Sequence, residues 1–300
     1  MRKLVILAFV GLAAQLVDGS LGMGYGVTSA TLLVAGGLGP AAASAAIHFS
    51  EIATTLASGA SHAALGNVDW GTVGILALPG FVGAFAGATL LVSVDASIAV
   101  PAVAVILLAL GGYVTWRFLT LRHLRFEGRP SARFLAPVGL VAGALDSVGG
   151  GGWGPVGTTT MLSSGRLEPR KVVGSVDAAE FVVTLGASLG FLLALGREGI
   201  EWSAAAALLV GGVVAAPLAA VLVRFMPPRV LGVAAGGVIV LTNLRTLAVE
   251  TGVSDLNLGL IAAVVFTLWV LWVSYAVKLE QAERAGSDDP RRQVRAHLPA

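Results

Sequence analysis

Long apolar stretches alternate with short polar ones along the whole chain. The apolar stretches cover residues 4–38, 41–64, 71–93, 97–119, 134–164, 172–196, 202–224, 229–248 and 257–277. A helix of about 20 apolar residues crosses a bilayer, because each residue adds about 1.5 Å toward a hydrocarbon core of about 30 Å. The pattern therefore predicts an all-α membrane protein that crosses the bilayer many times.

Composition agrees with this class. Hydrophobic residues make up 56% of the chain and charged residues 12%, whereas a soluble domain carries about 25% charged residues. The absence of cysteine excludes disulfides and thiolate metal sites. The net charge is only +2, and the basic residues flank apolar stretches, as membrane topology requires. We therefore expect the protein to contact a lipid bilayer and not nucleic acid.

Glycine clusters interrupt two of the apolar stretches. The first cluster is Asp18-Gly-Ser-Leu-Gly-Met-Gly-Tyr-Gly26, and Asp146-Ser-Val-Gly-Gly-Gly-Gly-Trp-Gly154 follows 128 residues later. Glycines break a helix and leave backbone polar groups without helical partners, which a membrane protein tolerates where that backbone is buried or lines a cavity. Paired interruptions at matching positions of two halves indicate the substrate site of a transporter.

The match between the two halves continues beyond the glycines. Glu51 matches Glu180 and Thr55 matches Thr184, at an offset of 129 residues. An internal duplication explains this pattern. We predict two homologous halves, each with a glycine-broken helical hairpin and three transmembrane helices, followed by one extra helix. The predicted boundaries are 1–116 and 134–248 for the halves, 117–133 for a basic cytoplasmic linker, 257–277 for the extra helix and 278–300 for a polar, disordered cytoplasmic tail.

The basic residues favour an inverted arrangement of the halves. If both broken stretches are hairpins and the linker is inside, all but four of the 19 Lys and Arg residues lie inside, the exceptions being Arg2, Lys3, Arg197 and Arg245. If each broken stretch crosses once, the halves are parallel and the basic residues divide almost equally. The positive-inside rule therefore favours hairpins. A mixed scheme with one hairpin leaves fewer basic residues outside, but it breaks the symmetry of the repeat and ranks second.

One helix carries an unbroken polar face. The residues Ser44, His48, Glu51, Thr55, Ser58 and His62 are spaced 4, 3, 4, 3 and 4 apart, which forms a stripe about 27 Å long on one side of a helix. Such a stripe should avoid lipid and face the bundle interior. Its counterparts in the second half include Asp177 and Glu180. We predict that His48, Glu51, Asp177 and Glu180 serve proton coupling or gating. The alternative is that these groups only hold helices together.

The glycine clusters are the predicted substrate site. Helices that start after a break present free N–H groups and partial positive charge, which suits an anion. The candidate binding residues are Asp18, Gly22, Gly24, Tyr25, Gly26, Thr28, Ser29, Thr31, Asp146, Gly150, Gly152, Trp153, Gly154, Thr158 and Thr159. Close helix packing through small residues is the alternative, but it does not explain an aspartate four residues before a Gly-x-Gly in both clusters.

Carboxylates inside the apolar stretches complicate an anion site. If all were ionised, they would repel an anion, so we expect proton binding at some of them to be coupled to the anion. A divalent-cation carrier that uses His48, Glu51, Asp177 and Glu180 is the alternative. The chain has no Walker motif, and His-x2-Glu is not the His-Glu-x2-His spacing of zinc proteases. We therefore predict neither an enzyme nor a cofactor, and no resident metal; a purely structural assembly factor is a weaker possibility.

Four segments together resemble the TauE/SafE family of sulfite exporters, within the larger group named for toluenesulfonate uptake permeases. They are Asp18 to Ser29, His62-x3-Gly-Asn-Val-Asp-Trp70, Gly150 to Pro155 and Lys171-x2-Gly-Ser175. The resemblance implies a multi-pass carrier in a prokaryotic inner membrane that exports sulfite, sulfoacetate or another organosulfonate. The second half has only Glu201-Trp202 in place of the His62 to Trp70 motif, so a symmetric site is in doubt. The glycine-rich faces at 80–87 and 211–219 would suit either a homodimer or internal packing.

Overall fold

The computed structural model describes residues 2–120, 128, 130–164, 166–222 and 227–287. Within these ranges the chain is helical, without a strand, which confirms the all-α prediction. The elements are α1 (Arg2–Leu21), α2 (Tyr25–Ala35), α3 (Pro40–Ala64), α4 (Trp70–Ser93), α5 (Ala96–Thr120), α6 (Ala132–Gly149), the π-helical turn η1 (Trp153–Thr158), α7 (Thr159–Ser164), α8 (Pro169–Leu195), α9 (Trp202–Leu222), α10 (Pro228–Glu250) and α11 (Asp255–Ser287).

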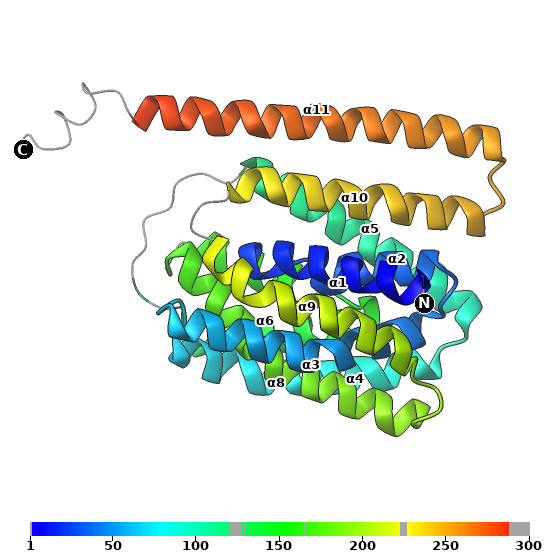
Figure 1. Cartoon of the computed structure of the whole chain (residues 1–300), viewed down its shortest axis with the longest axis horizontal. Coiled ribbons are helices and arrows are strands. Elements are labelled where there is room, and N and C mark those ends of the chain that lie inside the picture. Colours follow the sequence, from blue (N-terminus) through cyan, green and yellow to red (C-terminus); the bar gives the residue numbers. More distant parts are fainter. Residues whose placement is uncertain (1, 121–127, 129, 165, 223–226, 288–300) are drawn as a thin grey trace, which may run out of the picture.

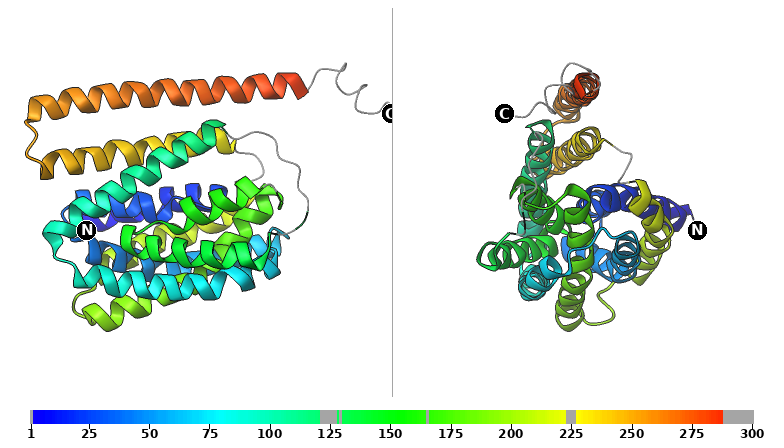
Figure 2. Two further views of the ribbon diagram at one scale, coloured as in Figure 1. Left: turned by 180° about the vertical axis from the view of Figure 1, so that it is seen from behind. Right: turned by 90° about the vertical axis from the view of Figure 1, so that its left-hand side faces the viewer.

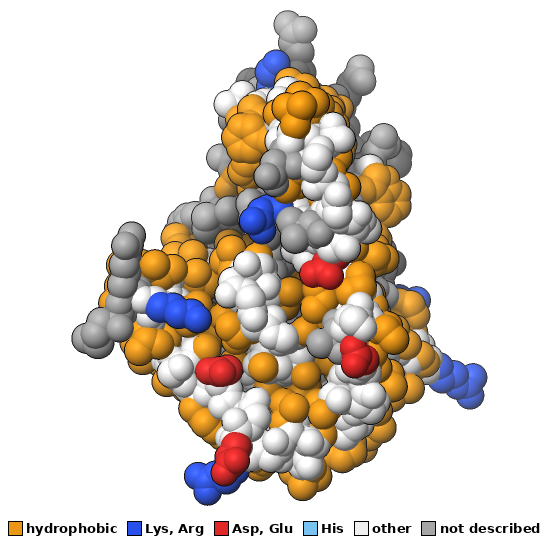
Figure 3. All heavy atoms as spheres, turned by 90° about the vertical axis from the view of Figure 1, so that its right-hand side faces the viewer, with side chains coloured by type: hydrophobic (Ala, Val, Ile, Leu, Met, Phe, Trp, Pro, Cys, Tyr) orange, Lys and Arg blue, Asp and Glu red, His pale blue; other side chains and the backbone are white. Residues whose placement is uncertain are grey.

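Seven of these helices are long and apolar enough to cross a membrane. They lie at Lys3–Leu21, Trp70–Ser93, Val100–Thr120, Ala132–Gly149, Arg170–Leu195, Trp202–Leu222 and Leu256–Ala282. Helix α3 has 25 residues and is equally long, but its polar stripe makes it less hydrophobic. Large apolar side chains such as Leu78, Val210 and Leu260 are exposed on the outer faces, as contact with lipid requires. In a view along the helices, the charged groups are scattered over the end of the bundle (Figure 3).

The helices lie side by side in one bundle, and each half packs on the other (Figure 1). Helix α1 packs on α9, and α6 packs on α4, which is the equivalent pair under the predicted duplication. Helices α5 and α10 pack on each other, as do α3 and α8. Helix α11 lies along one side of the bundle and mainly contacts α10 (Figure 2). The core is therefore shared between the halves, although the duplication itself stays a prediction.

Helix directions follow the hairpin scheme. Helix α1 begins at the end of the bundle where the N-terminus lies, and α2 turns back toward that end after the break (Figure 1). Helix α6 begins at the opposite end, beyond the linker, and α7 turns back toward that opposite end. Corresponding helices of the two predicted halves therefore run in opposite directions.

The glycine-rich faces are used inside the molecule. A Cβ atom on Gly83 would collide with the backbone of Leu140 in α6, and one on Gly87 would collide with that of Ala144. Gly211 lies in the same way against the backbone of Ala8 in α1. Small residues here let helix backbones approach closely, so these faces give no support to a homodimer.

Two predicted boundaries differ from the structure. Helix α5 continues to Thr120, so the first residues of the predicted linker are helical. Helix α11 continues to Ser287, so the prediction of a disordered tail is wrong for residues 278–287. That segment is rich in Lys, Leu, Glu, Gln and Ala, which favour a helix and extend it. The rest of the predicted tail, 288–300, and linker residues 121–127 and 129 lie outside the described residues.

Candidate functional site

The two glycine breaks meet in the interior of the bundle. Residues 18–27 and 149–155 are all buried. A Cβ atom on Gly26 would collide with the carbonyl of Gly150 and the Cα of Gly151, and one on Gly154 would collide with the backbone of Met23. The breaks therefore touch backbone to backbone, at a distance that only glycine allows.

The helices before the breaks end in the same way. Gly22 and Gly150, which correspond in the repeat, have φ angles of 67° and 68°, in the left-handed region that favours glycine. The N–H of Gly22 donates to the carbonyl of Asp18 at 2.5 Å, and that of Gly150 donates to the carbonyl of Asp146. Both α1 and α6 thus end in a left-handed C-terminal cap.

The two aspartates bridge the breaks. The carboxylate of Asp18 accepts a hydrogen bond from the N–H of Tyr25 at 3.3 Å, and that of Asp146 accepts one from Trp153 at 3.0 Å. Each carboxylate therefore reaches from the last turn before the break to the first turn after it, where it faces the positive end of the following helix. The chain's own carboxylates thus occupy part of the N–H sites that the sequence assigns to an anion.

Tyr25 and Trp153 attach the broken segments to the polar helix of their own half. The hydroxyl of Tyr25 lies 2.9 Å from Oγ of Ser50, which donates to the carbonyl of Ile47. The indole Nε1 of Trp153 donates to the carbonyl of Val176 at 3.1 Å. Ile47 and Val176 correspond at an offset of 129 residues, so both aromatic residues are directed toward equivalent carbonyls.

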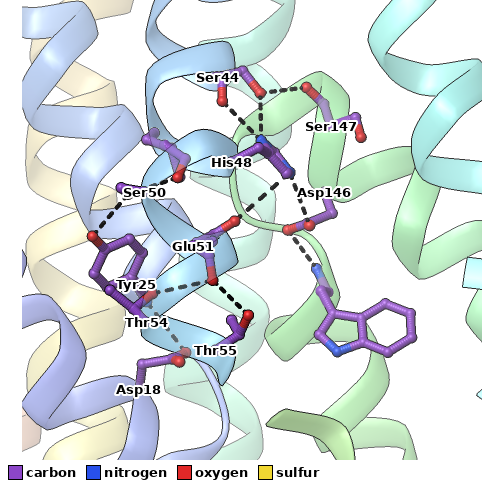
Figure 4. Close-up of polar contacts among 12 residues, drawn as sticks. Asp18, Tyr25, Ser44, His48, Ser50, Glu51, Thr54, Thr55, Asp146 and Ser147 are labelled. Atoms are coloured by element: carbon purple, nitrogen blue, oxygen red, sulfur yellow. Dashed lines mark hydrogen bonds and ion pairs between the residues drawn. The ribbon is translucent and has the colours of Figure 1, made fainter. Parts of the chain in front are cut away.

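The first polar cluster, which we call the His48 cluster, contains His48 and Glu51 of α3 and Asp146 of α6 (Figure 4). Nε2 of His48 lies 3.1 Å from Oδ2 of Asp146 and 3.9 Å from Oε2 of Glu51. Its Nδ1 lies 2.8 Å from the carbonyl oxygen of Ser44. The three cluster residues are at most 2% exposed.

The second cluster, which we call the Asp177 cluster, contains Asp177 and Glu180 of α8 and Asp18 of α1. In each cluster, one ligand atom from every residue lies within 4.8 Å of the others. Under the predicted duplication, Asp177 replaces His48, Glu180 replaces Glu51 and Asp18 replaces Asp146. Each cluster therefore joins the polar helix of one half to the broken segment of the other half.

The polar stripe of α3 contributes to both clusters. All six of its residues are buried. Beyond the His48 cluster, the hydroxyl of Ser58 donates to Oδ2 of Asp177 at 2.5 Å, and Nε2 of His62 lies 3.7 Å from the same oxygen. The structure thus brings the predicted coupling residues together with Asp18 and Asp146, which the sequence assigns to the substrate.

The profile of the sulfite exporter TauE/SafE family matches residues 7–246. This chain belongs to that family. It is also similar to the "Probable membrane transporter protein YtnM" of Bacillus subtilis (strain 168), with 45% identity over 284 residues that cover 92% of this chain and 93% of the relative. No solved structure matches it. The resemblance drawn from the sequence is confirmed, and the chain is a multi-pass membrane transporter.

Two of the TauE/SafE-like segments contact each other. Asp69 begins α4 as its N-cap, since Oδ1 accepts from the N–H of Thr72 at 2.8 Å. Its own N–H donates to Oγ of Ser175 at 2.8 Å, and Gly174 lies against the backbone of Asn67. The His62 to Trp70 segment therefore holds the first turns of α8, which carries Asp177 and Glu180, in place.

The predicted hydroxyl donors have different surroundings. Thr158 donates to the carbonyl of Gly22, and Oγ1 of Thr31 accepts from Nδ2 of Asn243 at 2.9 Å. Ser29 is fully buried, and its Oγ has no hydrogen-bond partner among the described residues. Thr28 is partly buried, whereas the side chain of Thr159 is outside the described part of the structure. Asn243 was missed, although an amide in the apolar stretch 229–248 is a sequence signal.

A cavity of about 270 Å³ opens near the end of the bundle where the N-terminus lies. It is formed by the end of α2, the start of α5 and the end of α10, and its lining includes Val34, Gly37, Val100, Arg245 and Glu250. Thr31 and Asn243 lie on the same helices, α2 and α10, within one turn before the lining residues Val34 and Arg245. The buried hydroxyl and amide groups therefore lie close in the chain to the cavity, whose lining holds one basic and one acidic residue.

Proposed function

We propose that this TauE/SafE transporter is a secondary carrier, in the inner membrane of a prokaryote, that exports a small sulfur anion such as sulfite, sulfoacetate or another organosulfonate with proton coupling. The observation that carries the proposal is the backbone contact between two glycine-broken segments at the centre of the bundle. Discontinuous helices at matching positions of two halves form the substrate sites of many secondary transporters.

Proton coupling follows from the positions of the two aspartates. Asp18 and Asp146 face the N–H groups of Tyr25 and Trp153, which are the groups that an anion would use. An ionised aspartate repels an anion from that place, whereas a protonated one does not. A proton on one of the two aspartates and the anion are therefore expected to bind together. If a doubly charged anion leaves the cell together with one proton, one net negative charge moves outward. A membrane potential that is negative inside favours this movement.

The experiment is uptake of radiolabelled sulfite into proteoliposomes under an imposed pH gradient. Unlabelled sulfoacetate, thiosulfate and sulfate serve as competitors that rank the ligands. We expect accumulation that follows the gradient and that is lost in Glu180→Gln. Folded wild-type protein that neither accumulates sulfite nor responds to any competitor would show that the substrate is not a sulfur anion.

A divalent-cation transporter is the second candidate. The specific observation in its favour is that each cluster offers three potential ligand atoms within 4.8 Å of one another, and histidine and carboxylates are common ligands of divalent metals. Binding of Mn²⁺ to purified protein, absent in Glu51→Gln, would support this candidate. Sulfite accumulation that is unchanged by Mn²⁺ would count against it.

A further inference from the structure

The two clusters differ in how their negative charge is balanced. In the His48 cluster, Nδ1 of His48 faces the Ser44 carbonyl, which can only accept a hydrogen bond. Its Nε2 faces the carboxylates of Asp146 and Glu51. A doubly protonated ring donates to acceptors on both sides, so His48 can supply this cluster with a positive charge of its own.

The Asp177 cluster has no such internal cation. His62 is its neighbouring base, with Nε2 at 3.7 Å from Oδ2 of Asp177. The same Nε2 lies closer to the carbonyl of Gly19, at 3.1 Å, and Nδ1 faces the amide nitrogen of Asn67 at 3.3 Å. A neutral ring, with Nε2 as donor and Nδ1 as acceptor, satisfies both contacts. No Lys or Arg within the described ranges forms an ion pair with Asp18, Asp177 or Glu180.

The surroundings of the Asp177 cluster add further negative charge. Glu51 and Asp146 of the His48 cluster lie near enough to act electrostatically on Glu180. Asp18 lies in the last turn of α1, where the helix dipole is negative. Three buried carboxylates in this place cannot all be ionised without a compensating cation, because like charges at short range in a low dielectric repel strongly.

Polar atoms without a hydrogen-bond partner among the described residues lie in and beside the Asp177 cluster. Oδ1 of Asp177, a residue that is 1% exposed, has no hydrogen-bond partner among the described residues. Both amide atoms of Gln15, which is also 1% exposed, are likewise unpartnered there. A Cβ atom on Gly19 would lie 3.5 Å from both Nε2 of Gln15 and Oγ of Ser58, the donor to Asp177. Gln15 thus borders the cluster, and its counterpart in the repeat, Gly143, offers no side chain.

We propose that the Asp177 cluster is the exchange site for the coupling cation, a proton or a sodium ion held by carboxylate oxygens, whereas the His48 cluster retains its own charge and exchanges none. The inference rests on the proposed function, because it names the group that links the cation to the anion. It also assigns different roles to two clusters that lie at corresponding positions of the predicted repeat.

The test compares wild type with Glu180→Gln, Asp177→His and the exposed control Glu201→Gln in proteoliposomes. Sulfite accumulation is measured under a pH gradient and, separately, under a sodium gradient; sulfite exchange is measured without either. We expect wild type and the control to respond to one of the gradients. Glu180→Gln removes a negative charge, and Asp177→His introduces an internal cation. Both variants should lose sulfite accumulation to the level of protein-free liposomes, while sulfite exchange is affected much less.

The reciprocal variant, His48→Asp, turns the first cluster into a copy of the second. We expect it to raise the number of cations moved per anion, seen as a shift of the reversal potential. Accumulation that survives in both Glu180→Gln and Asp177→His would overturn the proposal. Wild type that exchanges sulfite but responds to neither gradient would overturn it as well.

A measurement without sulfite separates this inference from the proposed function. Infrared difference spectra of purified wild type, between low and high pH and between low and high sodium, report carboxyl groups that exchange a cation. We expect the difference band to disappear in Glu180→Gln and to persist in Glu51→Gln. The opposite result would overturn the assignment of the exchange site. If the band behaves as expected but the protein moves no sulfite, the assignment of the cation site would stand and sulfite would be rejected as the substrate.

Discussion

At the scale of single residues, the contact between the broken segments depends on the absence of side chains. Gly26→Ala should destabilise the protein by about 1–3 kcal/mol, the usual cost of overpacking, because its Cβ would collide with the carbonyl of Gly150. Thermal unfolding in detergent measures the change. Gly74→Ala is the control, since nothing lies within 4 Å of its Cβ position. Equal melting temperatures for the two variants would contradict the backbone contact.

The aromatic residues of the breaks allow a matched comparison. Tyr25→Phe removes a hydroxyl whose partner, Ser50, keeps its bond to Ile47, and the expected cost is about 1 kcal/mol. Trp153→Phe removes the indole bond to the carbonyl of Val176 and also opens space in the core, so we expect a larger loss, above about 2 kcal/mol. Denaturant or thermal unfolding in detergent ranks the two. The reverse order would show that the indole bond contributes little.

At the scale of elements, the start of α4 depends on one capping residue. Asp69→Ala should cost about 1 kcal/mol, because the N–H of Thr72 loses its side-chain acceptor and keeps only the backbone carbonyl of residue 69. Asp69→Ser should retain most of the stability, since serine also caps well. Hydrogen exchange of the first turn of α4 detects the local loss, and the exchange of α8, which Asp69 contacts through Ser175, should rise with it. Unchanged exchange in α8 would argue against a link between the two segments.

The sequence predicts the helices and their breaks better than it predicts the contacts between them. The spacing from Ser44 to His62 predicts a helix with one polar face, and the breaks appear at the glycine clusters, because both are local properties of the chain. The pairing of Asp146 with His48 and of Asp18 with Asp177 is not local. It requires that each broken segment cross to the other half, which depends on the packing of α6 on α4 and of α1 on α9. Asn243 and Gln15 were missed for the same reason, since an isolated amide acquires a role only from its neighbours.

At the scale of the whole molecule, the basic residues are divided between the two ends of the bundle. Lys3, Arg197 and Arg245 lie at the end where α1 begins. The end of α5 and the starts of α6 and α8 lie at the other end (Figure 1), and they carry Arg117, Arg133 and Arg170. The positive-inside rule therefore predicts that the second end is cytoplasmic. Under this prediction, the cavity beside Arg245 would open on the outer side of the membrane.

The orientation can be tested directly because the chain has no cysteine. Lys3→Cys, Arg245→Cys and Arg170→Cys each introduce one exposed thiol. A membrane-impermeant maleimide added to intact cells should label the first two variants, and should label Arg170→Cys only after the membrane is opened. This result is expected because α1 with α2, and α6 with α7, form hairpins, which leaves three single crossings in each predicted half. Labelling of Lys3→Cys and Arg170→Cys from the same side would mean that one broken stretch crosses the bilayer completely. If only Arg170→Cys is labelled from outside, the inverted arrangement of the halves would stand, but the end of the bundle assigned to the cytoplasm would face outward.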